Sequence, residues 1–205
     1  MKEVAKDLLK IQAVKLSPDE PFTWASGIKS PIYCDNRLTI SYPQVRTQIA
    51  QGIADLIRTN YPKAEVIAGT ATAGIPHAAW IAAELNLPLV YVRSKPKDHG
   101  RGRQVEGVLP QGAKTVVIDD LFSTGGSILK AVAAARKEGA DVIGTCGIFS
   151  YQLAALDTNF QEAGLTYHTL TNYSELIDVA NEENYITAEQ KQVLQEWRQD
   201  PENWA

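Results

Sequence analysis

The residues best equipped for chemistry lie where a predicted buried strand ends. Residues 116–118 are apolar, Asp119 and Asp120 follow them, and residues 121–127 form a turn rich in hydroxyl groups and glycine. Glycines let the backbone approach a phosphate closely, and the N-terminus of the helix that follows adds partial positive charge. Serine and threonine hydroxyls in the turn can donate hydrogen bonds to the same phosphate oxygens. The two neighbouring acids can bind sugar hydroxyls, so the segment predicts a site for a phosphorylated sugar.

Simpler or better-known motifs account for only part of this segment. A strand–helix turn with an acidic helix cap fits residues 123–127 about equally well when they are taken alone. The chain contains no GxxxxGK[ST] loop of a nucleotide-binding protein. Gly100 and Gly102 do not extend to a dinucleotide-binding fingerprint, because position 105 is valine. The strand, the two acids and the turn together favour the phosphorylated-sugar site.

A second segment, residues 93–103, concentrates positive charge. It places five lysine or arginine side chains and His99 within eleven positions. Pro96, Gly100 and Gly102 argue against regular structure, which predicts a basic loop. A solvated charged loop is the ordinary interpretation. In a protein with a phosphate-binding turn, such a loop can also close over a phosphate group and stabilise the negative charge that develops on it.

Two further segments are open to more than one interpretation. Residues 69–76 follow a predicted strand and open a helix. Their small side chains either let the backbone bind an anion or allow the strand to pack tightly against the helix. Residues 22–35 combine aromatic side chains with turn residues, which is more often a packed loop than a binding site.

These segments lie between elements that alternate in type. Apolar runs typical of buried strands occupy residues 65–69, 88–92, 114–118 and 142–149. Helical patterns occupy residues 42–60, 74–86 and 127–138. Strands that are apolar throughout, with helices between them, predict a parallel sheet covered on both faces. We therefore expect an open α/β fold with its ligand site at the carboxyl ends of the strands.

The two ends of the chain differ from this alternating middle. A length of 205 residues suits one domain, which we expect over residues 1–205. We predict a core of about 39–149 and a small hood built from about 1–38 and 150–205. In the last third, Ser174 is expected to cap a short helix, and Thr187 with Gln190 forms a capping box ahead of a final helix.

Composition and charge argue against several classes of function. A formal net charge of -4 argues against general nucleic-acid binding, which needs a basic face. No run approaches the roughly 20 apolar residues of a membrane span, and the N-terminus lacks an apolar signal core, so we expect a cytoplasmic protein with no membrane partner. Cys34 and Cys146 form no CxxC pair, which favours two buried free thiols, and the scattered histidines argue against zinc.

The strand, acids and turn resemble the motif that binds 5-phosphoribosyl 1-diphosphate (PRPP) in type I phosphoribosyltransferases. The resemblance implies a fold with an open parallel sheet flanked by helices and a small hood. It also implies that Asp119 and Asp120 bind the ribose 2- and 3-hydroxyls. The loop that holds the 5-phosphate, partly through its backbone, would comprise Leu121, Phe122, Ser123, Thr124, Gly125, Gly126 and Ser127.

The basic segment looks like the catalytic loop of orotate phosphoribosyltransferases. The resemblance implies that Arg93, Lys97 and His99 contact the diphosphate, with His99 as a candidate proton donor. In that family the loop reaches into the neighbouring subunit's site, which implies a homodimer with shared sites. The matching loop of residues 69–76 assigns diphosphate binding to Thr72 and Ala73. The candidate catalytic residues are therefore Arg93, Lys97, His99, Asp119 and Asp120.

Residues 22–35 closely match the base-recognition region of the same family. The resemblance assigns orotate binding to Ile32, Tyr33, Cys34, Lys29 and Ser123. Some bacterial members of the family place lysines at the positions of Ala25 and Ala73, and an arginine near Tyr151. This chain therefore leaves open which residue binds the orotate carboxylate.

Together these resemblances imply transfer of ribose 5-phosphate from PRPP to orotate, giving orotidine 5'-monophosphate and pyrophosphate in pyrimidine biosynthesis. Mg²⁺ is expected to bind mainly through substrate and water, because it prefers oxygen ligands and keeps several waters. A purine-specific transferase is the alternative within this fold, and the match of residues 22–35 speaks against it. A transcription regulator that only senses PRPP is the alternative from another class, but such a protein should carry a basic DNA-binding appendage.

Overall fold

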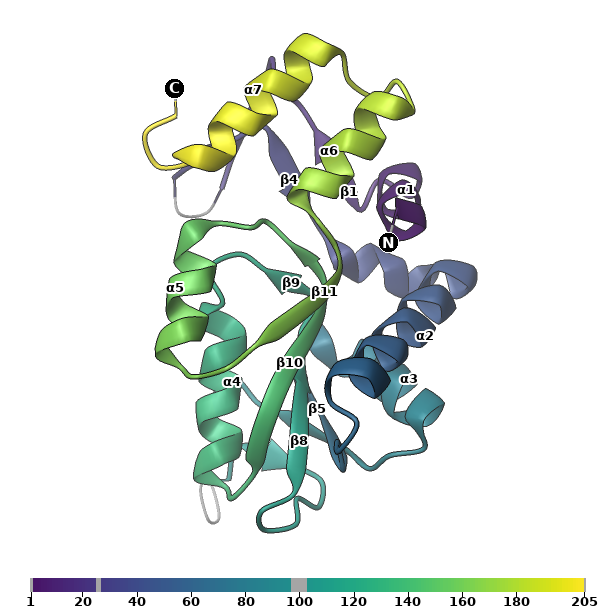
Figure 1. The fold of residues 1–205 in the computed structure, drawn as a ribbon, viewed down its shortest axis with the longest axis vertical. Coiled ribbons are helices and arrows are strands. Elements are labelled where there is room, and N and C mark those ends of the chain that lie inside the picture. Colours follow the sequence, from purple (N-terminus) through teal and green to yellow (C-terminus); the bar gives the residue numbers. More distant parts are fainter. Residues whose placement is uncertain (1, 25–26, 97–102, 205) are drawn as a thin grey trace.

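A mostly parallel sheet forms the centre of the protein (Figure 1). The computed structural model describes residues 2–24, 27–96 and 103–204. Within these residues the sheet has seven strands in the order β11-β10-β8-β5-β6-β7, with β9 paired to β10. The strands are β5 (Val66–Thr70), β6 (Leu89–Val92), β7 (Val105–Glu106), β8 (Lys114–Ile118), β9 (Leu121–Phe122), β10 (Asp141–Ser150) and β11 (Tyr167–Asn172). All pairs are parallel except β6 with β7, as expected for an open α/β fold.

Helices cover both faces of this sheet (Figure 1). The helices are α1 (Lys2–Lys10), α2 (Pro43–Asn60), α3 (Gly74–Leu85), α4 (Gly126–Lys137), α5 (Ala154–Glu162), α6 (Tyr173–Glu182) and α7 (Ala188–Gln199). The sheet separates two buried apolar clusters. One cluster joins α1, α2, α3, α6 and α7, and the other joins α4 and α5. Because both faces are packed, every residue of β5 is buried, which explains its unbroken apolar sequence.

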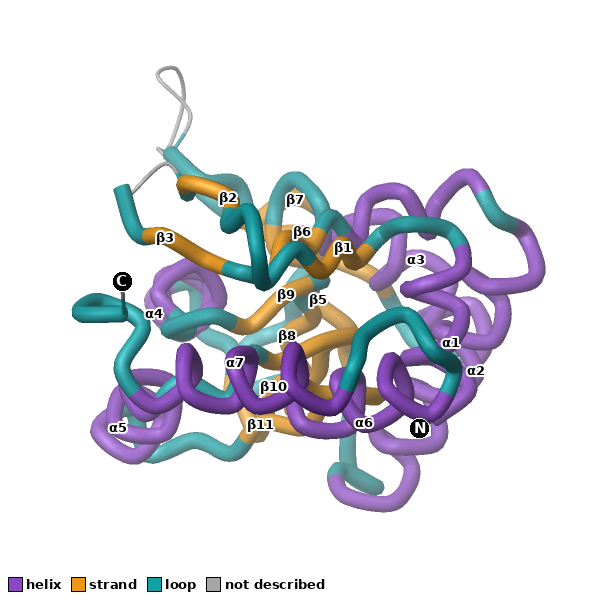
Figure 2. The backbone as a smooth tube through the Cα atoms, turned by 90° about the horizontal axis from the view of Figure 1, so that it is seen from above, coloured by secondary structure: helices purple, strands orange, loops and turns teal. Residues whose placement is uncertain are grey.

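Short strands and the last two helices lie above the end of the sheet at which β10 and β11 finish (Figures 1 and 2). The strands are β1 (Val14–Leu16), β2 (Phe22–Thr23), β3 (Lys29–Ser30) and β4 (Ile32–Cys34), followed by the 3-10 helix η1 (Asn36–Ser41). β1 pairs with β4 and β2 pairs with β3, both antiparallel. The fully buried Trp197 of α7 donates a hydrogen bond of 2.9 Å from Nε1 to the carbonyl of Lys29, so the two ends of the chain pack on each other.

The central sheet extends beyond the predicted core. β11 pairs with β10 over most of its length, although it lies after residue 149, where the predicted core ends. The physical reason is that the crossover through α5 returns the chain to the sheet edge, which a boundary drawn from changes in composition does not detect. The division into core and hood stays a prediction, but β11 belongs to the sheet and therefore to the core.

The start of α6 also differs from the prediction. Asn172, and not Ser174, is the N-cap, because its backbone is extended and its side chain accepts a hydrogen bond from the Glu175 N–H. The Ser174 hydroxyl lies inside the first turn and donates to Gln152 Oε1 at 2.7 Å. The capping box of Thr187 and the third helical residue is confirmed at α7.

Two other predictions can be checked in the described residues. Cys34 and Cys146 are both buried free thiols, as predicted. None of the described helices combines the length and apolar character that a membrane span needs.

Candidate active site

A cavity of about 430 Å³ opens at the carboxyl ends of β5 and β6, beside the start of α4. We call it the strand-end cavity. Its lining residues are Thr70, Ala71, Val92, Arg93, Ser94, Gln104, Ser123, Thr124, Gly126, Ser127, Lys130 and Ala131. The fold thus brings the predicted phosphate turn and the start of the predicted basic loop to one place, where α/β folds bind their ligands.

The turn of residues 121–127, which we call the phosphate loop, leaves its helix N-terminus open to a ligand. Gly125, the N-cap of α4, has φ +80°, a conformation that L side chains rarely adopt. A Cβ at this position would lie 2.9 Å from a ring carbon of Phe160, so only glycine fits. No side chain caps the first N–H groups of α4, and Asn159 Nδ2 donates to the Thr124 carbonyl at 2.9 Å. Uncapped helical N–H groups are donors for an anion.

Asp119 and Asp120, the acid pair, lie directly after β8. Asp119 is 5% exposed, and its Oδ1 accepts a hydrogen bond of 3.0 Å from the Asp120 N–H. Burial raises the pKa of both carboxyls, and the charge of Asp120 raises the pKa of Asp119 further, whereas a hydrogen bond with Ser127 lowers it. Two buried acids side by side favour a form in which one proton is retained, and they can both donate and accept hydrogen bonds.

The first residue of α3 packs directly against the acid pair. A Cβ at Gly74 would lie 2.6 Å from the Ile118 carbonyl oxygen and 3.2 Å from the Asp119 Cα. The small side chains of residues 69–76 therefore serve close packing at Gly74. The same loop also places Thr70 and Ala71 in the strand-end cavity, so tight packing and ligand binding apply to different residues of this segment.

Two residues of the cavity lining each have a buried polar atom without a hydrogen-bond partner among the described residues. The atoms are Oγ1 of Thr70 and Nη1 of Arg93. Nη1 of Arg93 lies 3.9 Å from Oε1 of Glu106, an ion-pair distance without a hydrogen bond. The lining thus contains a hydroxyl group and a guanidinium group, both of which can donate hydrogen bonds to the oxygen atoms of an anionic ligand.

Residues that the sequence reasoning missed also line this cavity. Lys130 is exposed, and it forms no hydrogen bond or ion pair with the described residues. It follows Ser127 by three positions on α4, a spacing that places both on one side of a helix and that could have identified it. Gln104 donates from Nε2 to the Arg93 carbonyl at 2.7 Å, and no sequence signal marks that contact.

Of the residues predicted to bind orotate, Ser123 lines this cavity. The others, which lie within residues 29–34, are outside its lining, and their side chains differ in accessibility. Ile32 is fully buried and Cys34 is 7% exposed, whereas Tyr33 between them is 43% exposed. This is the alternation of a strand, whose side chains point to opposite faces. Tyr33 packs on Phe22 with ring centroids 5.9 Å apart. Lys29 donates from Nζ to Thr23 Oγ1 at 2.7 Å, so its ammonium group already has a partner.

Other predicted residues are also placed away from the lining. Thr72 is exposed and Ala73 is the N-cap of α3, but neither lines the strand-end cavity. Tyr151 is buried among aromatic rings, with its centroid 5.2 Å from that of Trp24. Lys97, His99 and Ala25 lie outside the described residues.

Comparisons with known proteins show the family of the chain. The family model described as "Phosphoribosyl transferase domain" matches residues 41–163. A protein of Enterococcus faecalis named orotate phosphoribosyltransferase is 62% identical over 203 residues, which covers 99% of this chain and 97% of the relative.

Solved structures show the same likeness. UMP synthase of Leishmania donovani matches with a TM-score of 0.83 at 28% identity; the match covers 97% of this chain, which spans 42% of that protein. Orotate phosphoribosyltransferase of Aeropyrum pernix matches with a TM-score of 0.77 at 27% identity, covering 90% of this chain and 99% of the other. With its acid pair, its phosphate loop and a relative of 62% identity along nearly its whole length, the chain belongs to the orotate phosphoribosyltransferase family.

Proposed function

We propose that this chain transfers the 5-phosphoribosyl group from PRPP to orotate, giving orotidine 5'-monophosphate and pyrophosphate in pyrimidine biosynthesis. The observation that carries the proposal is the 62% identity, over 99% of the chain, to a relative named orotate phosphoribosyltransferase. The cavity supports it independently, because residues of the phosphate loop and Arg93 line it, and the acid pair lies directly between β8 and that loop.

The roles of the residues follow from their positions. The phosphate loop receives the 5-phosphate at the uncapped start of α4, with hydroxyl donors from Ser123 and Thr124 and the backbone N–H of Ser127. The acid pair binds the ribose 2- and 3-hydroxyls. The diphosphate is proposed to lie toward Thr70 and Arg93, which line the cavity at the neighbouring strand ends.

The reaction breaks the bond between the anomeric carbon and the diphosphate oxygen, and a ring nitrogen of orotate forms the new bond. Positive charge develops on the ribose and negative charge on the diphosphate as the bond breaks. The protein therefore stabilises charge and needs no nucleophile of its own. The guanidinium of Arg93 stabilises the leaving diphosphate, and Lys97 and His99 are proposed to add to it from the basic loop. The negative charge of orotate near neutral pH is on its carboxylate, so the attacking ring nitrogen gives up its proton to water as the new bond forms.

Magnesium is proposed as the metal that accompanies PRPP. The acid pair supplies oxygen ligands of the kind that magnesium prefers, so the residues present fit it. Their raised pKa values and the absence, among the described residues, of a group of three or more metal-binding side chains favour an ion that takes most of its ligands from substrate and water. When bound, it would supply positive charge beside the diphosphate.

Orotate is proposed to bind between Tyr33 and the phosphate loop. The exposed ring of Tyr33 offers a flat surface for stacking, and Ser123 offers a hydroxyl at the near side of the cavity. Ile32 and Cys34 have buried side chains, so we propose that they act through their main chain. Lys29 stays a candidate for the carboxylate. A homodimer in which the basic loop completes the partner's site, and a cytoplasmic location, are parts of the same proposal.

The test is to follow the loss of orotate absorbance in a mixture of purified protein, PRPP, Mg²⁺ and orotate. We expect magnesium-dependent consumption that falls steeply in Lys97→Ala and is unchanged in Lys63→Ala, an exposed lysine far along the chain from the basic segment. Turnover with a purine base but not with orotate would overturn the assignment of orotate as the substrate. Binding of PRPP without turnover of any base would favour the alternative function, a transcription regulator that only senses PRPP.

A further inference from the structure

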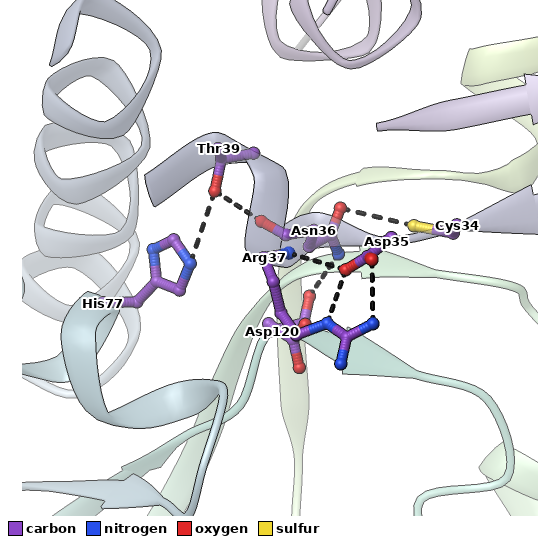
Figure 3. Close-up of polar contacts among 7 residues, drawn as sticks. All are labelled: Cys34, Asp35, Asn36, Arg37, Thr39, His77 and Asp120. Carbon is purple, nitrogen blue, oxygen red and sulfur yellow. Dashed lines mark hydrogen bonds and ion pairs between the residues drawn. The ribbon is translucent and has the colours of Figure 1, made fainter. Parts of the chain in front are cut away.

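Three polar side chains form a fully buried chain of contacts between α3 and the acid pair (Figure 3). Asn36 and Thr39 are 0% exposed and His77 is 1% exposed. We call them the buried polar network. Asn36 and Thr39 belong to η1, and His77 belongs to the first turn of α3. None of the three lines the strand-end cavity, so none is placed to touch a ligand there.

The contact with the acid pair is made by Asn36. Its Nδ2 donates to the Asp120 carbonyl at 2.6 Å, although the two residues are 84 positions apart in the chain. Its Oδ1 accepts from Cys34 Sγ at 3.3 Å. The Asn36 amide thus accepts a hydrogen bond from Cys34 through its oxygen and donates one to Asp120 through its nitrogen, as Figure 3 shows. Because an amide offers its donor and its acceptor in a fixed plane, it fixes the direction of the Asp120 carbonyl.

Thr39 and His77 hold the turn that carries Asn36. The Thr39 hydroxyl donates to the Asn36 carbonyl at 2.6 Å, which uses its one proton. The 3.4 Å contact between Thr39 Oγ1 and His77 Nε2 therefore has the imidazole as donor. His77 Nδ1 then carries a lone pair, and no described residue donates to it. Burial lowers the pKa of His77 to about 4, so the ring is neutral at physiological pH, in agreement with this assignment.

Hydrogen bonds in a buried network hold their groups in a single arrangement. Every link from Asp120 to His77 is made, and His77 Nδ1 is the atom of these three side chains that lacks a partner among the described residues. The residues that the network fixes here are those proposed to bind ribose. We infer that Asn36 is a positioning residue for the acid pair, and that Thr39 and His77 act through Asn36 by holding η1 against α3. This inference rests on the proposed function, since it assigns the effect to PRPP binding.

The test compares Asn36→Ala and Thr39→Val with Thr115→Val. Thr115 is an equally buried threonine at the other end of β8, and its hydroxyl also donates to a backbone carbonyl, that of Ala113 at 2.9 Å. Thr115→Val therefore reports the general effect of removing a buried hydroxyl. Thr39→Ser keeps the hydroxyl and serves as the conservative variant.

The readouts are the Kd for PRPP by titration calorimetry, the KM values for PRPP and orotate, kcat, and the thermal midpoint. We expect the Kd and KM for PRPP to rise about tenfold in Asn36→Ala and about threefold in Thr39→Val, because a displaced acid pair no longer meets the ribose hydroxyls. The KM for orotate should change little. Thr39→Ser should restore the PRPP values, and Thr115→Val should lower the thermal midpoint without changing them.

Two results would overturn the inference. One is a wild-type Kd for PRPP in folded Thr39→Val and Asn36→Ala. The other is an equal loss of PRPP affinity in Thr115→Val. If Asn36→Ala does not fold, Thr39→Val with its serine control decides alone. A wild-type protein that binds PRPP but does not consume orotate would contradict the proposed reaction, while the calorimetric comparison would still test the positioning role.

Discussion

Two regions build the candidate site in different ways. The phosphate loop is contiguous with the acid pair, and its shape comes from local features: a glycine with positive φ and the start of α4. The segment of η1 reaches the same acid pair from 84 positions away, through a single buried amide. The first region is set by short-range backbone chemistry, and the second exists only when the tertiary structure has formed.

The two regions also differ in accessibility. Ser123 and Thr124 are accessible and line the strand-end cavity, as groups that touch a ligand must. Asn36, Thr39 and His77 are buried and line no part of it. We therefore assign ligand binding to the accessible groups of the phosphate loop. We assign orientation of the acid pair to the buried polar network. Substitutions in the two regions should therefore affect stability and PRPP binding in different proportions.

The largest expected effect is that of Asp119→Asn, which tests the acid pair that both regions share. We expect kcat/KM to fall by about 10²-fold or more, because the carboxyl group proposed to bind the ribose hydroxyls is lost. At the same time the protein should become more stable. Burial and Asp120 raise the Asp119 pKa above its ordinary 3.8, so the folded protein holds a proton that the unfolded chain releases. The contribution of Asp119 to the stability of the wild type therefore falls as pH rises above about 4.

The measurement is thermal unfolding at a series of pH values between 5 and 8, with and without the substitution. Asparagine does not titrate, so the stability advantage of the variant should grow with pH until the raised pKa of Asp119 is passed. Each unit of pKa elevation corresponds to about 1.4 kcal/mol. A variant that unfolds below the wild type at every pH would contradict the assignment of the raised pKa.

The second prediction isolates the locally determined shape of the phosphate loop. Gly125→Ala forces a left-handed conformation on an L side chain and places its Cβ 2.9 Å from Phe160. We expect a loss of stability of about 1–2 kcal/mol and a rise of about tenfold in the KM for PRPP. Gly164→Ala is the matched control, since Gly164 has φ +62° but open space around its Cβ. If both variants raise the KM equally, the local shape of the loop is not what binds PRPP.

The same contrast explains how much could be predicted from the sequence. β5, α3, β8 and α4 begin and end within two residues of the predicted ranges, because apolar runs and glycine turns are local signals. The placement of the phosphate loop next to Arg93 also follows from the sequence, since the carboxyl ends of parallel strands meet at one edge of a sheet.

What the sequence could not predict depends on contacts between distant residues. Nothing near Asn36 indicates that its amide meets the Asp120 carbonyl. Nothing within residues 32–34 indicates which side chains point into the core, because that follows from the pairing of β4 with β1. β11 looked like part of a peripheral region until its pairing with β10 placed it in the sheet.

The third prediction tests whether the PRPP-binding site extends beyond the phosphate loop to Lys130. We expect Lys130→Ala to raise the KM for PRPP about threefold to fivefold, because an exposed cation contributes about 1 kcal/mol or less to an ion pair. Lys137→Ala removes a charge from the last turn of the same helix, away from the cavity, and should leave the KM unchanged. The difference between the two variants should shrink at high ionic strength. Equal KM values in both variants would remove Lys130 from the site.

The smallest expected effect at neutral pH is that of His77→Gln, which tests the buried region without removing its hydrogen bond. Glutamine can keep a donor to Thr39, but it does not titrate. The folded pKa of His77 is about 4 and the ordinary value is 6.5, so the unfolded chain binds more protons between these values. The contribution of His77 to the stability of the wild type should therefore fall as pH drops through 6.5, by about 1 kcal/mol between pH 7 and pH 5.5, against the opposite contribution of Asp119.

This fall should be absent in His77→Gln and reduced only slightly in His168→Gln, since His168 is partly exposed and its pKa is also lowered by burial. The measurement is urea unfolding at pH 7 and pH 5.5 for the three proteins. A wild-type slope that survives in His77→Gln would mean that the ring is protonated in the folded protein. The contact with Thr39 would then be made by a charged imidazole, and the buried region would be held by charge and not by a neutral hydrogen bond.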